Sequence, residues 1–547
     1  MAWTQNYDPF QSWPLSTVVA GVPILVLLGS LALLRVRAHW ASISGLVAAL
    51  LVATLGFGMP VGMAARAALM GAGYGLLPIG WIILNVVFLY NLTDQRGLFG
   101  VLRDSLTRVT CDSRLQLLLV AFCFGAFFEG AAGFGTPVAV TAANLIGLGF
   151  PPLAASGFSL LANTAPVAFG ALGTPIIALA GITGLPISEL SAMVGRQLPF
   201  FSLLVPFWLI WAYAGVKGLS GIWPAVLVAG AAFAIPQLLV SNLHGPWLVD
   251  VIASLISMGA LVGFLRMWRP KEIWGVDGKP ADRSAPRTPV HSRRAVLKAW
   301  LPWIILSVVV FIWGLPIVKA FLDHVSAVRL RVPGLDQMVL RTPPVVTHST
   351  PEDAVYTLNW LSATGTGLLV AALISAFLIG YRPIEIARTY WATIKRVRYS
   401  LLTVACMLAL GYVSRYTGLD ATLGLAFSRT GVLYPFFGTL LGWLGVALTG
   451  SDTSSNVLFG GLQKISATQL GLSPTLMAAA NSSGGVMGKM IDAQSIVVAS
   501  TATKWYGHEG DILKFVFLHS LALAALVGLL VFLQAYVPPF TWMVIRP

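Results

Sequence analysis

Charged side chains are scarce in this chain of 547 residues, of which only 10% are Asp, Glu, Lys or Arg. A soluble domain carries about 25% charged residues. Hydrophobic residues make up 57% of the chain, and the mean hydropathy is +0.82. A chain with so little charge cannot cover a surface that faces water. The composition therefore excludes a soluble globular protein and predicts an integral membrane protein.

Cysteine is almost absent as well. Cys111, Cys123 and Cys406 are too few and too scattered for a disulfide framework or a Cys-x-x-Cys metal site. The sequence also lacks a cluster of metal ligands, a P-loop and a Gly-x-Ser-x-Gly motif. We therefore expect no metal, no cofactor and no catalytic residues. The missing P-loop argues against a self-contained ATP-driven pump.

Basic residues are missing from the first stretch, Met1 to Trp13. A cleavable signal peptide has a basic n-region there, so we expect the first apolar run to remain in the mature chain. Over the whole chain, 34 bases against 20 acids give a net charge of +14. In a soluble protein this excess would suggest nucleic acid, but membrane proteins keep Lys and Arg in cytoplasmic loops. We expect the lipid bilayer as a partner and no nucleic acid.

The positions of these bases orient the chain. Between residues 266 and 298 lie nine bases and three acids, so this loop is expected in the cytoplasm. The bases within 35–37, 96–114 and 382–398 are expected on the same side. The segment 319–356 has mixed charge and is expected outside, together with both termini.

Apolar runs of about 20 residues, the length that a helix needs to cross a bilayer, recur along the chain. Only helices and closed barrels can face lipid, and these runs are too long for the roughly ten-residue strands of a barrel. We expect helices over 17–34, 40–59, 74–92, 114–131, 134–150, 153–186, 197–215, 221–241, 247–268, 299–318, 357–379, 399–417, 432–450, 454–472, 474–503 and 513–537. Because Gly, Ser and Thr crowd 134–150 and 454–472, re-entrant hairpins are the alternative there.

A similar pattern occurs on both sides of the central basic loop. In the first half, EGAAGFGTP (129–137) is followed by the pair Asn163-Thr164. In the second half, GSDTSSN (450–456) is followed at a similar separation by Asn481-Ser482. By the loop charges, the two segments enter the membrane in opposite directions. This is typical of inverted-repeat transporters, whose substrate lies where broken helices meet near the midplane.

Two acids stand in these Gly-rich stretches, Glu129 and Asp452. Glycine, proline and hydroxyl residues at membrane depth break helices and leave backbone N–H and C=O groups without helical partners. Such groups must face protein or a water-filled cavity. The alternative is close helix packing, which small residues also favour. An ionised acid in a span is costly and is a functional hypothesis by default. Because desolvation raises the pKa of a carboxylate, each acid is a candidate for proton coupling. The alternative for each is neutralisation by a structural partner.

A small carboxylate substrate needs hydrogen-bond donors. Helix N-termini at a break supply them, and so do hydroxyls and amides, although a lone hydroxyl often bonds its own helix. Two nearby cations, Arg196 and Lys489, could bind the substrate carboxylate. Arg196 could instead extend to the membrane interface, and Lys489 could instead form an ion pair with Asp492. The candidate substrate-binding residues are Gly130, Gly135, Thr136, Asn163, Thr164, Arg196, Ser451, Thr453, Ser454, Ser455, Asn456, Asn481, Ser482, Ser483, Lys489 and Gln494.

The remaining ionisable residues near spans are assigned weaker roles. Asp250 and His519 lie near span ends and are expected at the membrane interface. His244 is either structural or a pH sensor. The others are expected at boundaries or in loops: Arg66, Arg415, Asp420 and Lys464.

Several of these runs resemble the L-lactate permease family, which includes glycolate permeases. They are EGAAGFGTPVA (129–139), NTAPVAFGALG (163–173), GRQLPF (195–200), VPFWL (205–209), LTGSDTSSN (448–456), GKMI (488–491) and QSI (494–496). The resemblance covers nearly the whole chain and implies a bacterial inner-membrane symporter that takes up lactate or glycolate with protons. In the family, Lys-Met-Ile usually continues Ser-Pro-Gln-Ser, whereas this chain has an acid, Asp492, and no proline.

The residues and the resemblance together predict a multi-pass all-α membrane protein. About 12 to 16 transmembrane or re-entrant helices form two inverted repeats with broken helices at the midplane. An N-terminal half (1–268) and a C-terminal half (299–547) flank a basic cytoplasmic linker (269–298). The sequence leaves the oligomeric state open.

For function, we expect a secondary active transporter rather than an enzyme. It would co-transport protons with L-lactate or a related 2-hydroxymonocarboxylate, such as glycolate or D-lactate. Sodium-coupled carboxylate transport is the alternative, because broken-helix carbonyls and hydroxyls also bind sodium. A channel and an intramembrane enzyme are weaker readings, since the sequence offers no nucleophile–base pair.

Overall fold

The computed structural model describes residues 2–32, 34, 36–98, 100–101, 104, 109–131, 133, 136–276, 291–346, 348–506 and 508–545. Within these residues, 11 helices are long and apolar enough to cross a membrane. The number rises to 12 if the bent pair Pro152–Ala162 and Val167–Thr183 is one span. The protein is therefore an all-α, multi-pass membrane protein, as its apolar runs predict.

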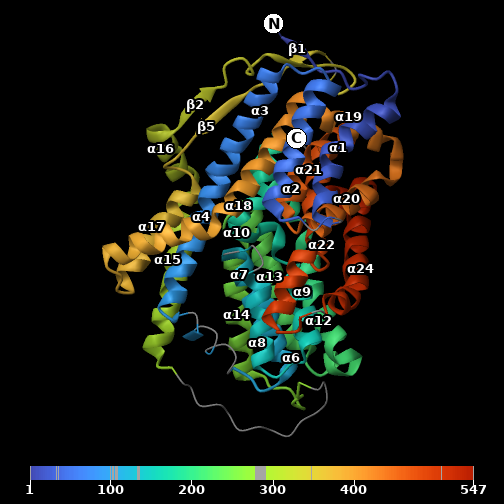
Figure 1. The fold of residues 1–547 in the computed structure, drawn as a ribbon. Helices are drawn as coiled ribbons and strands as arrows, with labels where there is room; N and C mark the ends of the chain where they lie inside the picture. The colour runs from blue at the N-terminus through green and yellow to red at the C-terminus, as the bar shows by residue number, and fades with distance from the viewer. Residues whose placement is uncertain are drawn as a thin grey trace.

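Apart from one short strand near the N-terminus, the first half of the chain is mainly helical in its described part (Figure 1). Its α-helices are α1 (Trp13–Ala32), α2 (Ala38–Leu51), α3 (Val61–Tyr74), α4 (Trp81–Gln95), α6 (Ser113–Leu117), α7 (Gly125–Ala131), α8 (Thr136–Gly147), α9 (Pro152–Ala162), α10 (Gly170–Thr183), α11 (Ile187–Val194), α12 (Leu198–Ser220), α13 (Trp223–Leu243) and α14 (Val249–Met267). Short π or 3-10 segments join some of them: η1 (Val52–Gly56), η2 (Gly75–Gly80), η3 (Leu118–Phe124) and η4 (Val167–Phe169).

The second half adds ten helices with ordinary α geometry. They are α15 (Arg293–Gly314), α16 (Pro316–Ser326), α17 (Thr364–Leu378), α18 (Pro383–Thr417), α19 (Leu419–Phe427), α20 (Tyr434–Thr449), α21 (Asp452–Gln469), α22 (Pro474–Gly488), α23 (Ala493–Ala502) and α24 (Glu509–Tyr536). The 3-10 segments are η5 (Ser428–Leu433) and η6 (Phe540–Met543), and the strands are β1 (Trp3–Thr4), β2 (Val328–Arg331), β3 (Val339–Arg341), β4 (Thr350–Pro351) and β5 (Val355–Leu358).

Four predicted spans differ from the observed helices. The run 153–186 is divided by the break between α9 and α10, where the helix direction bends by 63°. The run 474–503 is not one helix, because the chain breaks between α22 and α23. The run 399–417 is only the second part of the 35-residue helix α18. Bases such as Arg388 and Lys395 lower the hydropathy of its first part, so a search for apolar runs misses that part. The run 357–379 begins in β5, and its helix starts at Thr364.

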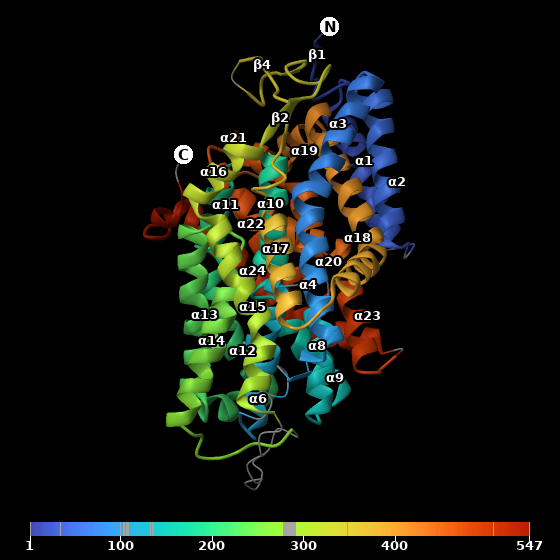
Figure 2. The same cartoon turned by 90° about the vertical axis from the view of Figure 1, so that its left-hand side faces the viewer.

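The extramembrane strands lie at one end of the molecule, beside the N-terminus and α19 (Figures 1 and 2). β1 pairs in parallel with β3, which pairs antiparallel with β4. β2 and β5 form an antiparallel pair with Val328 opposite Leu358. α6 and the last turns of α14 lie at the opposite end of the molecule (Figures 1 and 2).

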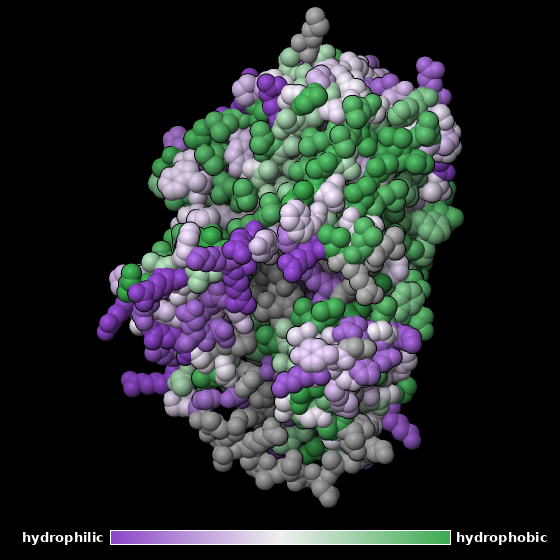
Figure 3. Space-filling view, in the orientation of Figure 1, coloured by the Kyte–Doolittle hydropathy of each residue, from purple (hydrophilic) through white to green (hydrophobic). Residues whose placement is uncertain are grey.

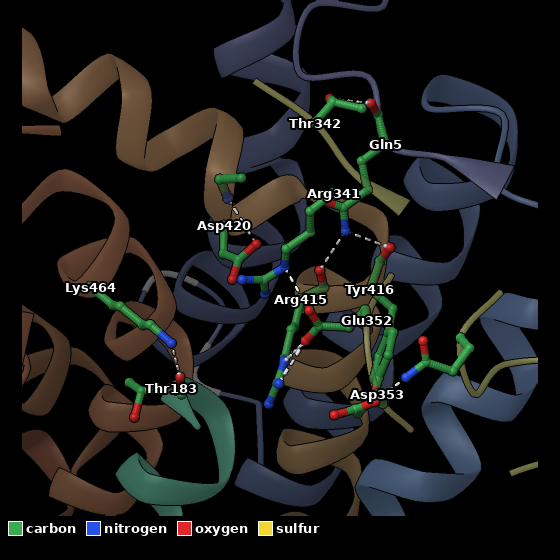
Figure 4. A network of polar contacts seen from close by, with 12 residues as sticks. Gln5, Thr183, Arg341, Thr342, Glu352, Asp353, Arg415, Tyr416, Asp420 and Lys464 are labelled. Atoms are coloured by element: carbon green, nitrogen blue, oxygen red, sulfur yellow. Dashed lines mark hydrogen bonds and ion pairs between the residues drawn. The ribbon is translucent and has the colours of Figure 1, made fainter. Parts of the chain in front are cut away.

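An ion-pair network fastens the strands to the helices (Figure 4). Glu352 bonds Arg341 of β3 at 2.8 Å and Arg415 of α18 at 2.6 Å. Arg415 also donates to the carbonyl oxygen of Gly181 at 3.2 Å, and Lys464 donates to that of Thr183 at 2.6 Å. Both carbonyls belong to the last turn of α10, where cations are stabilised by the helix dipole. The network therefore joins the strands to the end of α10.

The surface in Figure 3 separates apolar from charged regions. Apolar side chains cover the upper part of this face, over α1, α2 and α3, as expected for contact with lipid. Hydrophilic side chains gather where α17 is followed by α18. Arg382, Arg388 and Arg396 are exposed in this part of the chain.

The inner helices are related in pairs. α7 and α8 in the first half are separated by a break, and α20 and α21 in the second half are separated by another. A second break follows in each half, between α9 and α10 and between α22 and α23. α10 packs on α21, and α23 packs on α8. A helix of the first half, α10, therefore packs on a helix of the second half, and α23 of the second half packs on a helix of the first. This reciprocal packing agrees with two inverted repeats.

Candidate functional site

Four helices begin inside the protein, each directly after a break in the chain. They are α8, α10, α21 and α23. The first residues of a helix have N–H groups without partners in the helix and carry the positive end of its dipole. Four such ends in one region favour a bound anion.

The breaks meet at one cavity of about 170 Å³. Its lining comes from all four breaks and from α18: Glu129, Gly133, Val167, Gly170, Ala171, Thr174, Pro175, Ser400, Gly450, Ser451, Asp452, Thr453, Lys489, Gln494, Ser495 and Val498. Two acids and one cation are thus placed around a space at the ends of broken helices.

The break before α10 has a left-handed backbone. Ala171, Leu172 and Gly173 have φ angles of 44°, 56° and 78°. Residues with a side chain adopt this region at a cost of order 1–3 kcal/mol each, so packing must hold the turn in place. The chain bends by 63° at this break, and Thr174 and Pro175 start the right-handed part of α10 at the cavity.

Glu129 stands in the last turn of the continuous helix Ser113–Ala131. The residue is 5% exposed, and Asn163 Nδ2 donates to its Oε2 at 3.1 Å. Gly170 passes so close that an added Cβ would approach Oε1 at 2.5 Å. The carboxylate is therefore held between α9 and the start of α10, facing the cavity.

Asp452 is the first residue of α21 and is 3% exposed. Its Oδ2 accepts hydrogen bonds from the Ser482 hydroxyl at 2.5 Å and from Asn456 Nδ2 at 3.3 Å. Asn456 also donates to the carbonyl oxygen of Pro175 at 3.2 Å. Asp452 is thus bonded to α22 and, through Asn456, to the break before α10.

Lys489 is the cation of the cavity in the described part of the chain. Its Nζ donates to the Gly450 carbonyl at 2.6 Å and lies 3.3 Å from Asp492 Oδ2. Asp492 in turn caps α23, because its Oδ1 accepts from the Ser495 N–H at 2.7 Å. The ion pair that the three-residue spacing offered as an alternative is present. The hydrogen bond from Lys489 to Gly450 joins the two breaks of the second half.

The predicted site residues fall into layers around this cavity. Ser451, Thr453, Lys489 and Gln494 line it, together with the two acids. A second layer bonds the acids directly and consists of Asn163, Asn456 and Ser482. Asn481 is one step further out, donating to Asn456 Oδ1 at 2.9 Å.

Six other predicted residues make contacts away from the cavity. Arg196 donates to Asn242 and to the Met543 carbonyl, and Ser483 donates to Gln197. The Thr164 and Ser455 hydroxyls bond backbone carbonyls, the Ser454 N–H bonds the Ser451 side chain, and Gly130 packs on Asp250. Gly135 lies outside the described residues, and for Thr136 only the backbone is described.

Several lining residues were not predicted. Thr174 and Pro175 belong to the Gly-Thr-Pro run of the first half, so a helix start after glycine was the signal for them. Ser495 follows Gln494 directly. Ser400 comes from α18, and nothing in its local sequence connects it with the breaks.

The expected interfacial position of Asp250 is wrong. Asp250 is 1% exposed and packs against Gly130 of α7. Its position near the end of an apolar run suggested an interface, but α7, α10 and α13 pack against α14 and bury it.

A larger hollow of about 620 Å³ lies near the N-terminus. It is lined by residues such as Asn6, Asp8 and Arg429, and the Arg429 guanidinium is 3.9 Å from the centre of the Trp13 ring. None of the four breaks contributes to its lining, so it lacks the helix ends that favour an anion.

Comparison with known proteins places the chain in a family. The family model described as L-lactate permease matches residues 16–538. The chain is 45% identical to the glycolate permease GlcA of Escherichia coli (strain K12), with 100% of both chains covered. It is 45% identical to an L-lactate permease of Salmonella typhimurium over 99% of both chains, and 44% identical to one of Bacillus subtilis over 100% of both. A crystal structure of the Alcanivorax borkumensis YdaH transporter covers 87% of the chain at 16% identity, with a TM-score of 0.45.

Proposed function

The chain belongs to the L-lactate permease family, and we propose that it is a proton-coupled symporter for L-lactate and related 2-hydroxymonocarboxylates. Glycolate and D-lactate are included among the substrates. The protein would act in the bacterial cytoplasmic membrane, with the basic linker (269–298) inside. The halves 1–268 and 299–547 would each supply two of the four breaks.

The observation that supports this proposal is the meeting of helix N-termini and Lys489 at one cavity. A carboxylate there finds backbone N–H groups, dipole ends and a cation. Since a site for one water needs about 10–15 Å³ of this kind of space, a cavity of about 170 Å³ has room for a small organic anion. Thr174, Ser451, Thr453 and Gln494 would share the hydrogen bonds to the carboxylate and to the 2-hydroxyl group.

Proton coupling follows from the charge in the cavity. An anionic substrate close to ionised Glu129 is repelled, whereas protonation of Glu129 removes that repulsion. A proton and a substrate anion together carry no net charge across the membrane. With one proton per substrate, each pH unit contributes about 1.4 kcal/mol, or about tenfold accumulation.

Sodium coupling is less well supported by the same contacts. A sodium site at the breaks would use free backbone carbonyls. The Gly450 carbonyl already accepts from Lys489, and the Pro175 carbonyl accepts from Asn456. Both oxygens are therefore engaged in the described structure.

The test is uptake of labelled L-lactate into proteoliposomes, with either a proton or a sodium gradient imposed. Unlabelled glycolate, D-lactate and pyruvate serve as competitors. We expect accumulation with an inward proton gradient, its loss with an uncoupler, and competition by the two 2-hydroxy acids. Accumulation driven by sodium alone, or none from correctly folded protein, would refute the proposal.

A further inference from the structure

Asp250 is a buried acid outside the cavity. It is the second residue of α14 and is 1% exposed. Among the described residues, none forms a hydrogen bond with either of its carboxylate oxygens. Buried polar groups in proteins are nearly always hydrogen-bonded, so this acid requires an explanation.

The surroundings of Asp250 are largely apolar. α7, η3, α10 and α13 pack against α14. α10 and α13 contain no titratable side chain. η3 contributes Cys123, whose Sγ lies 3.3 Å from Ser257 Oγ further along α14. α7 contributes Glu129. An ionised Asp250 would thus have no hydrogen bond from a described residue to stabilise its charge.

The contact with α7 is unusually close. A Cβ built on Gly130 would fall 2.6 Å from the Asp250 Cβ, so only glycine allows α14 to approach α7 at this level. Gly130 is the residue next to Glu129 in the chain. The contact therefore brings Asp250 next to the residue that precedes Gly130 in one buried region, and two acids in a dry environment do not both ionise readily.

We propose that Asp250 is a proton-relay residue that supplies the proton to Glu129. This rests on the proposed proton symport. When substrate enters, the Asp250 carboxyl gives its proton to the Glu129 carboxylate through a bridging water and becomes a carboxylate itself. Glu129 later releases that proton on the cytoplasmic side, and Asp250 takes up a new one from the outer side. One proton is thus taken up and one released in each cycle.

The position of Asp250 agrees with this direction. It stands at the start of α14, and the end of that helix leads to the basic loop expected in the cytoplasm. Asp250 does not line the cavity, so it can act while substrate occupies the site. Asp250 would hold the proton and pass it on to Glu129, and it would not contact the substrate.

The experiment compares Asp250→Asn with wild type in proteoliposomes. With a gradient of about one pH unit, wild type should accumulate L-lactate up to about tenfold, and the variant should only equilibrate it. Exchange of labelled for unlabelled L-lactate across the membrane needs no net proton movement and should stay within about twofold of wild type. Ser254→Ala removes a buried hydroxyl one turn further along α14, whose bond is to its own helix, and should behave as wild type in both assays.

A spectroscopic measurement separates a proton role from a structural one. Wild type should show the infrared carbonyl band of a protonated carboxyl that is missing in Asp250→Asn. Unchanged accumulation by Asp250→Asn would overturn the relay, and so would loss of exchange along with accumulation in folded protein. If wild type itself shows no proton-driven accumulation, the proposed function fails first, and the relay fails with it.

Discussion

The two acids of the cavity occupy opposite ends of their helices. Glu129 is in the last turn of Ser113–Ala131, where the helix dipole is negative, and it receives a hydrogen bond from Asn163. Asp452 is in the first turn of α21, where the dipole is positive, and it receives bonds from Ser482 and Asn456. The helix dipole and the hydrogen bonds therefore stabilise a negative charge better on Asp452 than on Glu129.

This difference suggests a division of labour between the halves. An acid whose ionised form is better stabilised can hold neighbouring elements together as a carboxylate. An acid whose ionised form is less stabilised takes up and releases a proton more readily. We expect Glu129 to carry the proton and Asp452 to maintain the shape of the cavity. The following predictions test that difference, beginning with the largest expected effect.

Lys489→Met should have the largest effect, because it leaves Asp492 buried without its ion partner. Removing one partner of a buried pair costs about 3–5 kcal/mol. Thermal unfolding in detergent should therefore shift strongly downwards, and uptake of L-lactate should be lost. Lys489→Met with Asp492→Asn removes both charges and should recover most of the stability. A single variant as stable as wild type would show that the pair does not hold the second half together.

A pair of glycine substitutions should separate the roles of the acids. A Cβ on Gly170 would meet the Glu129 carboxylate, and one on Gly485 would meet that of Asp452, each closer than 3.0 Å. Overpacking of this kind costs about 1–3 kcal/mol. Gly170→Ala should reduce accumulation more than exchange of L-lactate, and Gly485→Ala should reduce both equally. The same ratio of accumulation to exchange in the two variants would contradict the division of labour.

Much of the cavity could be predicted from sequence, because the breaks in membrane helices have a characteristic composition. Glycines and hydroxyls beside an acid at membrane depth identified Glu129 and Asp452, and both line the cavity. The sequence could not show whether a hydroxyl such as that of Thr164 faces the cavity. The same residue type can bond either the backbone of its own helix or a ligand. Arg196 was equally ambiguous, since a cation beside a motif in sequence can point elsewhere in space.

The fold was harder to predict where tertiary packing decides the outcome. Hydropathy located most spans, but it joined α22 to α23 and missed the basic start of α18. The burial of Asp250 depends on helices that are distant in the chain and meet at Gly130. No window of local sequence contains that contact.

The most direct test compares Glu129→Gln with Asp452→Asn in the same proteoliposomes. Lactate accumulation under an inward gradient of about one pH unit and gradient-free exchange are measured side by side. We predict that Glu129→Gln loses the tenfold accumulation and retains exchange, whereas Asp452→Asn lowers both by a similar factor. Wild-type accumulation by Glu129→Gln, or selective loss of accumulation by Asp452→Asn, would contradict the assignment of the proton to the first half.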